Sequence, residues 1–165
     1  MNSDLILLFR HLTHGVYVIG VSDKDKVNAF TAAWVMQVSY RPLLIALSVN
    51  RGHSSYKMLV DGGAFSVNVL SGRQVELARH FGQPAKVNKL GSIKWHRCRS
   101  GAPVLDDAMA WFDCKYSHES PAGDHVLVFG HVIDGALLDT GALPMNYRDI
   151  CNMDESSKLY PDDFL

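Results

Sequence analysis

The amino-acid sequence predicts a mainly β protein: an antiparallel β-barrel with a few short helices inserted between its strands. The chain has six or seven segments rich in β-branched and aromatic residues, each bounded by turn residues. Its candidate helices are short, and they do not alternate with the strands as in a doubly wound parallel sheet. A length of 165 residues fits one domain over 1–165, with a core at about 10–150 and a C-terminal extension at 151–165.

The first third of the chain is expected to be mostly extended. Residues 4–12 fit a short amphipathic helix, and residues 15–23 are rich in Val and Ile and predict a strand. Residues 27–39 hold too many β-branched and aromatic residues for a helix, so we expect one long extended segment there. The nearly all-apolar run at 42–49 predicts a strand that is buried on both faces.

The middle of the chain predicts two short helices with a strand between them. Residues 54–61 fit a helix with a hydroxyl cap near its start and a pair of glycines after its end. Residues 64–70 predict a strand, and residues 74–81 a second helix. Residues 83–103 are polar and are expected to be irregular.

Two long strands are expected near the C-terminal end of the chain. They cover residues 109–119 and 124–134, and the turn residues at 120–123 join them. The sequence therefore predicts a long β-hairpin as the last regular element.

Charge and composition exclude several classes of protein. Sixteen basic and 17 acidic residues give a net charge of -1, without the basic excess typical of nucleic-acid or membrane binding. The N-terminal apolar run, Leu5 to Phe9, is too short for a membrane span and lacks the positive flank of a signal peptide. The three cysteines form no CxxC pair, which favours a reducing compartment, so we expect a cytoplasmic protein.

The familiar nucleotide and metal motifs are missing from the sequence. It contains no GxGxxG and no GxxxxGK[ST], so a bound nucleotide would need another kind of phosphate site. Its His and Cys pairs are not joined to second pairs at zinc-site spacing, so no metal site is expected.

Two segments carry residues suited to a flat anionic ligand. Residues 28–34, NAFTAAW, combine short polar and small side chains that let a planar group approach the backbone. Residues 48–57 place hydroxyls and cations where a buried strand gives way to a helix, as in many phosphate sites. The alternatives are a strand packed closely under a helix for the first segment, and an ordinary capped helix with solvated cations for the second.

Two histidines lie in similar positions at the ends of elements. His80, next to Arg79, falls in the last turn of a predicted helix, where cations complement the helix dipole. His125 follows Asp124 at the mouth of a strand, which places an imidazole at the rim of the barrel. The alternative for each is a solvated side chain without a functional role.

In their order and separation these segments resemble the flavin reductase-like family, which has the FMN-binding split-barrel fold. The resemblance covers about residues 10–150 and implies a homodimer with flavin near the interface, FMN more readily than FAD. The matching text is HGVYVIGVSD, NAFTAAWVMQVSYRPLLIALSVNRGHSSYKML, FSVNVLSGRQVELARHFG, GAPVL, AWFDCKYSHESPAGDHVLVFGHVID and MNYRD.

The resemblance assigns the flavin contacts to residues from four segments. Those implied along the isoalloxazine ring and ribityl chain are Asn28, Thr31, Ala32, Ala33 and Trp34. Those implied at the ring from the next strand are Ser48, Val49 and Asn50. Those implied around the phosphate are His53, Ser54, Ser55, His80 and Phe81.

The resemblance also implies a nicotinamide site and a reaction. His125, Tyr147 and Arg148 would face NADH or NADPH, with His125 as the catalytic residue for hydride transfer to the flavin. Residues 33–35 read Ala-Trp-Val where many relatives carry hydroxyls. Some relatives are electron carriers reduced by a partner protein, so a non-enzymatic flavoprotein is the alternative. In either case a flavin-using oxygenase or another redox protein would be the downstream partner.

Overall fold

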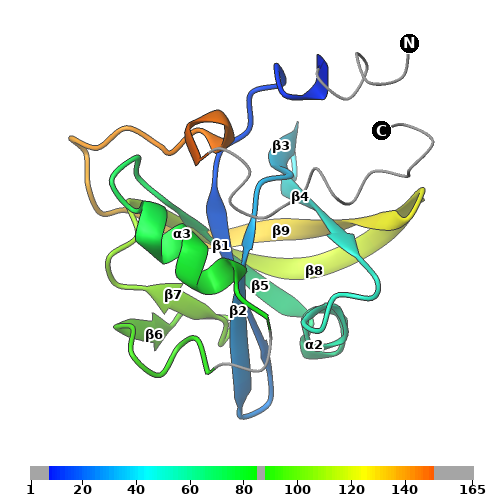
Figure 1. The fold of residues 1–165 in the computed structure, drawn as a ribbon. Coiled ribbons are helices and arrows are strands. Elements are labelled where there is room, and N and C mark those ends of the chain that lie inside the picture. The colour runs from blue at the N-terminus through cyan, green and yellow to red at the C-terminus, as the bar shows by residue number, and fades with distance from the viewer. Residues whose placement is uncertain (1–7, 85–87, 151–165) are drawn as a thin grey trace.

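The computed structural model describes residues 8–84 and 88–150. These residues form a seven-stranded antiparallel sheet, a separate two-stranded sheet and three short helices (Figure 1). The strands are β1 (Tyr17–Asp23), β2 (Lys26–Ala32), β3 (Val35–Tyr40), β4 (Leu43–Asn50), β5 (Ala64–Val69), β6 (Trp95–Arg97), β7 (Pro103–Leu105), β8 (Ala110–Ala122) and β9 (His125–Leu137). The helices are α2 (Tyr56–Gly62), α3 (Val75–Gly82) and the 3₁₀ helix η1 (Tyr147–Ile150).

The large sheet confirms the predicted fold class. Its strand order is β2-β1-β5-β8-β9-β4-β3, and every neighbouring pair is antiparallel. Within the described residues β2 and β3 are the two edge strands, so the sheet does not close on itself. The result is a split-barrel architecture with β8 and β9 at its centre.

The expected single extended segment at 27–39 is wrong. The chain forms β2 up to Ala32 and then β3 from Val35, and these strands lie at opposite edges of the sheet. Between them Val35 N donates to Ala33 O at 3.0 Å, and Ser48 N donates to Trp34 O at 3.0 Å. Both strands are rich in the residue types that favour extended structure. The break is therefore visible only in the pairing, since β2 pairs with β1 and β3 pairs with β4.

Other predicted boundaries also need correction. The irregular stretch expected at 83–103 contains β6, which pairs with β7; Leu105 is buried in the second core cluster, and Trp95 packs partly buried against that cluster. The hairpin turn is tighter than expected: residues 120–122 continue β8, and Gly123 takes φ 68°. Of the helix expected at 4–12, residues 8–9 are helical, but residues 10–12 form a turn and a bend, so the helix ends earlier than expected. Residues 4–7, like the extension at 151–165, lie outside the described residues.

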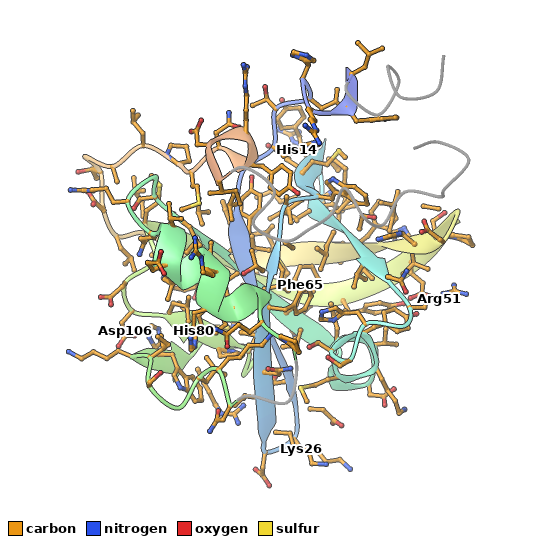
Figure 2. All side chains as sticks on the ribbon, viewed as in Figure 1. His14, Lys26, Arg51, Phe65, His80 and Asp106 are labelled. Carbon is orange, nitrogen blue, oxygen red and sulfur yellow. The ribbon has the colours of Figure 1, made fainter. Side chains whose placement is uncertain are left out.

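Alternation along β1 divides the core into two clusters. Ile19 and Val21 face one side of the strand and pack with Phe65 of β5, which lies near the centre of the molecule (Figure 2). Val16 and Val18 face the other side and pack with a second cluster that includes Phe81 of α3. The sheet is thus buried on both faces over β1, which fixes α3 against it.

The two α-helices pack against different strands of the large sheet. Helix α3 contacts β2 and β1, whereas α2 contacts β1 and β5 (Figure 1). Gly63 ends α2 in the left-handed conformation, φ 68°, and its N–H donates to Leu59 O and Val60 O, as the paired glycines predicted. Helix α3 therefore packs on the edge strand β2, whereas α2 packs on the inner strands β1 and β5.

Candidate functional site

Strand β2 is where the predicted flavin segments meet. Asn28 Nδ2 donates to Ser55 Oγ at 3.0 Å, and the ring of Phe30 lies 4.4 Å from the His53 imidazole, so this face meets the loop before α2. On the opposite face Thr31 Oγ1 donates to Ala78 O of α3 at 2.6 Å. The edge strand therefore connects the loop before α2 with helix α3.

A cavity of about 310 Å³ opens beside the end of β2, between α3 and η1. Three predicted ring-binding residues, Thr31, Ala32 and Ala33, lie along it with Tyr147, which was assigned to the nicotinamide. The full lining is Val16, Thr31, Ala32, Ala33, Ala78, Arg79, Gly82, Gln83, Tyr147 and Ile150. Small side chains on one wall and an Arg on another suit a flat ligand with polar edges.

Most backbone N–H groups of the loop before α2 donate hydrogen bonds within the loop itself. Gly52 N donates to Asn50 Oδ1 at 2.7 Å, and His53 N donates to Asn50 O at 2.9 Å. Ser55 N donates to His53 Nδ1, and the N–H of the next residue, Tyr56, donates to His53 O. Among the described residues, the Ser54 amide is the one between residues 52 and 56 that has no acceptor.

The hydroxyl cap predicted for this helix is wrong. Ser55 occupies the N-cap position of α2, but its side chain makes no capping hydrogen bond. Its buried Oγ accepts from Asn28 Nδ2, because the serine faces β2 and not the helix. Ser55 therefore holds the loop on the edge strand.

The contacts of His53 fix its protonation. Its Nδ1 accepts a hydrogen bond from Ser55 N, so the ring proton of the neutral form lies on Nε2. Burial lowers the pKa of His53, and the positive charge of Lys89 lowers that pKa further. His53 is thus a neutral imidazole with one N–H available to an acceptor.

Lys89 is a buried cation that the sequence did not reveal as a candidate. It is 3% exposed, and its Nζ donates to Phe81 O at 2.9 Å. Its carbonyl oxygen in turn accepts from His80 Nε2 at 2.6 Å. Burial lowers the pKa of Lys89, and its positive charge acts on His53 in the loop before α2. In the sequence it is one lysine within a polar stretch, without periodicity that marks it as buried.

The two residues assigned to close the phosphate end differ in their contacts. The side chain of Phe81 is fully buried in the core beneath α3, so its carbonyl group, not its ring, reaches the site. His80 lies on α3 in Figure 2 and holds Lys89 in place. Arg51 instead pairs with Glu119 Oε1 at 3.1 Å, and Tyr56 Oη donates to Glu119 Oε2 at 2.7 Å.

His125 lies apart from the cavity, at the start of β9. Its Nδ1 is 2.8 Å from Asp124 Oδ1, and this hydrogen bond lowers the pKa of the aspartate. The ring of Trp34 lies 5.2 Å from the imidazole, tilted by 55°. The strand pairing places His125 opposite Asn50. The catalytic candidate therefore adjoins the crossing segment between β2 and β3.

Strand β4 places its three predicted residues differently. Val49 is buried in the core, Ser48 is half-buried and Asn50 is exposed, with its side chain bonded to Gly52 N. Ser48 donates its backbone N–H to Trp34 O, which fixes the crossing segment against β4.

The predicted nicotinamide residues fall into two groups. Tyr147 and Arg148 belong to η1, which lies at the N-terminal end of β1, where Tyr147 N donates to His14 O at 2.8 Å (Figure 1). Tyr147 lines the cavity, whose wall does not include His125. Arg148 is exposed. The structure thus places Tyr147 and His125 against different parts of the segment from Thr31 to Trp34.

Within residues 8–84 and 88–150 no cluster of three His, Cys, Asp or Glu side chains is arranged to hold a metal ion. In the same residues no helix has the length and apolar character needed to cross a membrane.

The model of the flavin reductase like domain matches residues 9–152. This chain belongs to the flavin reductase-like family. The match confirms the resemblance that the ordered motifs indicated.

Relatives of this flavin reductase-like chain include enzymes and longer flavoproteins. The "Probable flavin reductase" of Rhizobium meliloti is 33% identical over 119 residues, which are 72% of this chain and 38% of the relative. The "FMN reductase (NADH)" of Methylorubrum populi is 32% identical over 72% of this chain and 59% of its own length. "Diflavin flavoprotein A 1" of Synechocystis is 25% identical over 92% of this chain and 27% of its own length. The chain therefore spans less than two thirds of each of these relatives.

Solved structures of similar flavin reductases share the fold. The NADH:FAD oxidoreductase of Streptomyces globisporus superposes with a TM-score of 0.81 at 27% identity, covering 88% of each chain. The flavin reductase component of a bacterial two-component tryptophan halogenase gives a TM-score of 0.79 at 29% identity, covering 91% of this chain and 95% of its own.

Proposed function

We propose that this chain binds FMN along β2 and reduces it with NADH or NADPH. The observation that carries the proposal is the buried cation Lys89 at the end of α3, whose positive charge acts on His53 in the loop that contacts the edge strand. A buried ammonium with one described acceptor, Phe81 O, is stabilised by a bound anion. A flavin phosphate is an anion of the required kind, and family membership supports it.

The residues of the site fit a flavin. Lys89 Nζ, the Nε2–H of His53 and the Ser54 amide are donors for a phosphate. The small side chains of Ala32 and Ala33 leave room for the ring system in the cavity between α3 and η1. FMN is favoured over FAD because a single phosphate matches this compact donor set.

His125 supplies the second part of the proposed reaction. When bound, the flavin accepts at N5 the hydride, with its electron pair, that leaves C4 of the reduced nicotinamide. The Asp124 carboxylate fixes His125 Nδ1, which leaves Nε2 to orient the nicotinamide carboxamide by a hydrogen bond. Tyr147 and Arg148 would hold the remainder of the nucleotide from η1. Reduced nicotinamides are cytoplasmic metabolites, and the unpaired thiols of Cys98 and Cys114 suit a reducing compartment.

A homodimer is part of the proposal. Strand β3 is an edge strand, and Met36, Val38 and Tyr40 are exposed by 59%, 42% and 83%. An exposed apolar edge of this kind favours pairing with another chain. A second copy would cover β3 and the neighbouring Leu43, which is also exposed.

A non-enzymatic electron carrier is the second candidate function. The diflavin relative matches 92% of this chain as 27% of its own length, so a similar domain occurs inside a longer flavoprotein. Other relatives are named as reductase components of a trigonelline monooxygenase and a tryptophan halogenase. We therefore propose a flavin-using oxygenase or another redox protein as the downstream partner.

The decisive experiment mixes purified protein and FMN with NADH or NADPH and follows absorbance at 340 nm. We expect oxidation of at least one nucleotide well above the flavin-free and protein-free controls. Tight retention of FMN without oxidation of either nucleotide would rule out the reductase and favour the carrier. Mass spectrometry of the released cofactor distinguishes FMN from FAD.

A further inference from the structure

Trp34 lies outside the cavity that the other predicted ring-binding residues of β2 line. The cavity beside β2 is lined by Thr31, Ala32 and Ala33, but its wall does not include Trp34. The indole instead lies against the His125 imidazole, with ring centroids 5.2 Å apart and an interplanar angle of 55°. The aromatic side chain thus contacts the predicted nicotinamide side of the site.

The indole can leave this position without disturbing the fold. Trp34 is 49% exposed, and neither core cluster of the described residues contains it. Its backbone is held independently, because its carbonyl oxygen accepts from Ser48 N. A rotation about the side-chain torsions therefore moves the ring and leaves the crossing segment between β2 and β3 in place.

His125 is the fixed member of this pair. Its side chain is 23% exposed, its Nδ1 is bonded to Asp124, and its backbone lies in β9 opposite Asn50. A planar ligand that takes the place of the indole beside the imidazole must displace it. The nicotinamide ring is a flat aromatic group that would lie there, with its carboxamide at Nε2.

We propose that Trp34 occupies the nicotinamide position against His125 and must swing away before the nucleotide binds. This proposal rests on the proposed reductase function and adds a residue that sets nucleotide affinity. Trp34 acts here as a positioning residue, because it controls access to His125. Its replacement should strengthen nucleotide binding, the opposite of the effect of losing a ligand contact.

Steady-state kinetics of W34A and W34F provide the test. We expect the KM for NADH to fall by roughly two- to tenfold in W34A, as for loss of one aromatic contact, and by less in W34F. The turnover number should change less than KM, and the FMN dissociation constant, measured by quenching of flavin fluorescence, should stay within about twofold of wild type. W111F is the matched control for W34F, because Trp111 also lies beside a histidine, His96, but on β8.

Tryptophan fluorescence supplies a second readout. NAD⁺ binds without transferring a hydride, so it should shift the emission of wild type and W111F to longer wavelength and leave W34F unshifted. An unchanged or raised KM in W34A, weaker FMN binding, or the same shift in W34F would overturn the role of Trp34. Failure of wild type to oxidise either nucleotide would instead overturn the reductase function itself, and this proposal with it.

Discussion

Lys89 Nζ donates a hydrogen bond of 2.9 Å to the carbonyl oxygen of Phe81 in the last turn of α3. The ammonium group thus lies where the helix dipole is negative, which favours a cation, although burial lowers its pKa. Because His80 also binds the Lys89 carbonyl, α3 holds both the backbone and the side chain of this residue. The cation is preorganised for an anionic group.

Replacing Lys89 by methionine should weaken the binding of FMN. Loss of a hydrogen bond to a charged phosphate costs about 1.5–3 kcal/mol, so the dissociation constant should rise by at least tenfold in a fluorescence titration. K57M is the control, because Lys57 is exposed and pairs with Asp61 on the outer side of α2. Unchanged FMN affinity in K89M would place the phosphate elsewhere.

Replacing Ser54 and Ser55 by alanine separates a structural role from a binding role. S55A removes the acceptor of Asn28 Nδ2, so it should lower the free energy of unfolding by about 1 kcal/mol as well as weaken FMN. S54A should leave stability unchanged, since Ser54 is exposed. In the double variant FMN binding should be weaker by roughly 1–3 kcal/mol. Urea titrations and FMN titrations on all three variants measure these effects, and equal stabilities would contradict the role given to Ser55.

Removal of the His125 imidazole should slow reduction by the nucleotide and spare flavin binding. H125A loses the oriented imidazole but none of the proposed phosphate contacts, so kcat/KM for NADH should fall by about 10²-fold. H118A provides the control: His118 lies on β8 of the same hairpin and stacks on Phe129 at 4.5 Å. A collapse of FMN affinity in H125A would make the histidine a flavin ligand.

The pKa of His53 predicts loss of stability in acid. Its folded pKa lies below the ordinary value of 6.5, so between these two values the unfolded chain binds more protons than the native protein. The contribution of His53 to the free energy of unfolding is therefore constant above about pH 6.5. The free energy of unfolding decreases as the pH falls below that value. Urea unfolding at pH 7.5 and 5.5 should show a smaller decrease for H53Q than for wild type. An equal decrease in both proteins would mean that His53 does not resist protonation.

A charge on the edge strand should dissociate the proposed dimer. Tyr40 is 83% exposed on β3, so Y40K would leave the monomer folded while it places a cation in an apolar contact. Light scattering after size exclusion should report a dimer for wild type and a monomer for Y40K. A monomeric wild type would contradict the dimer.

The core offers a check on the fold. An ideal Cβ at Gly130 of β9 would lie 2.6 Å from the Phe65 ring, so the glycine makes room for the aromatic side chain. G130A should lower the free energy of unfolding by about 1–3 kcal/mol, the usual cost of overpacking, in a urea titration. G72A should be milder, because no atom lies within 4 Å of its Cβ.

The sequence by itself determined the fold class, most strands and helices, and the family. Alternating and buried apolar runs are local patterns, and paired glycines end α2 by local backbone geometry. The small residues from Thr31 to Ala33 were recognised as room for a flat ligand, and they do line the cavity.

Only the tertiary structure decided which strands lie at the edges and which side chains meet. The break at Ala33 and Trp34 arises because β2 pairs with β1 and β3 with β4, which is information from distant residues. The ammonium group of the buried Lys89 bonds to a carbonyl group of α3. The side chain of Ser55 does not cap α2 and instead accepts a hydrogen bond from Asn28. Such contacts depend on the packing of separate elements, so composition and spacing along the chain do not reveal them.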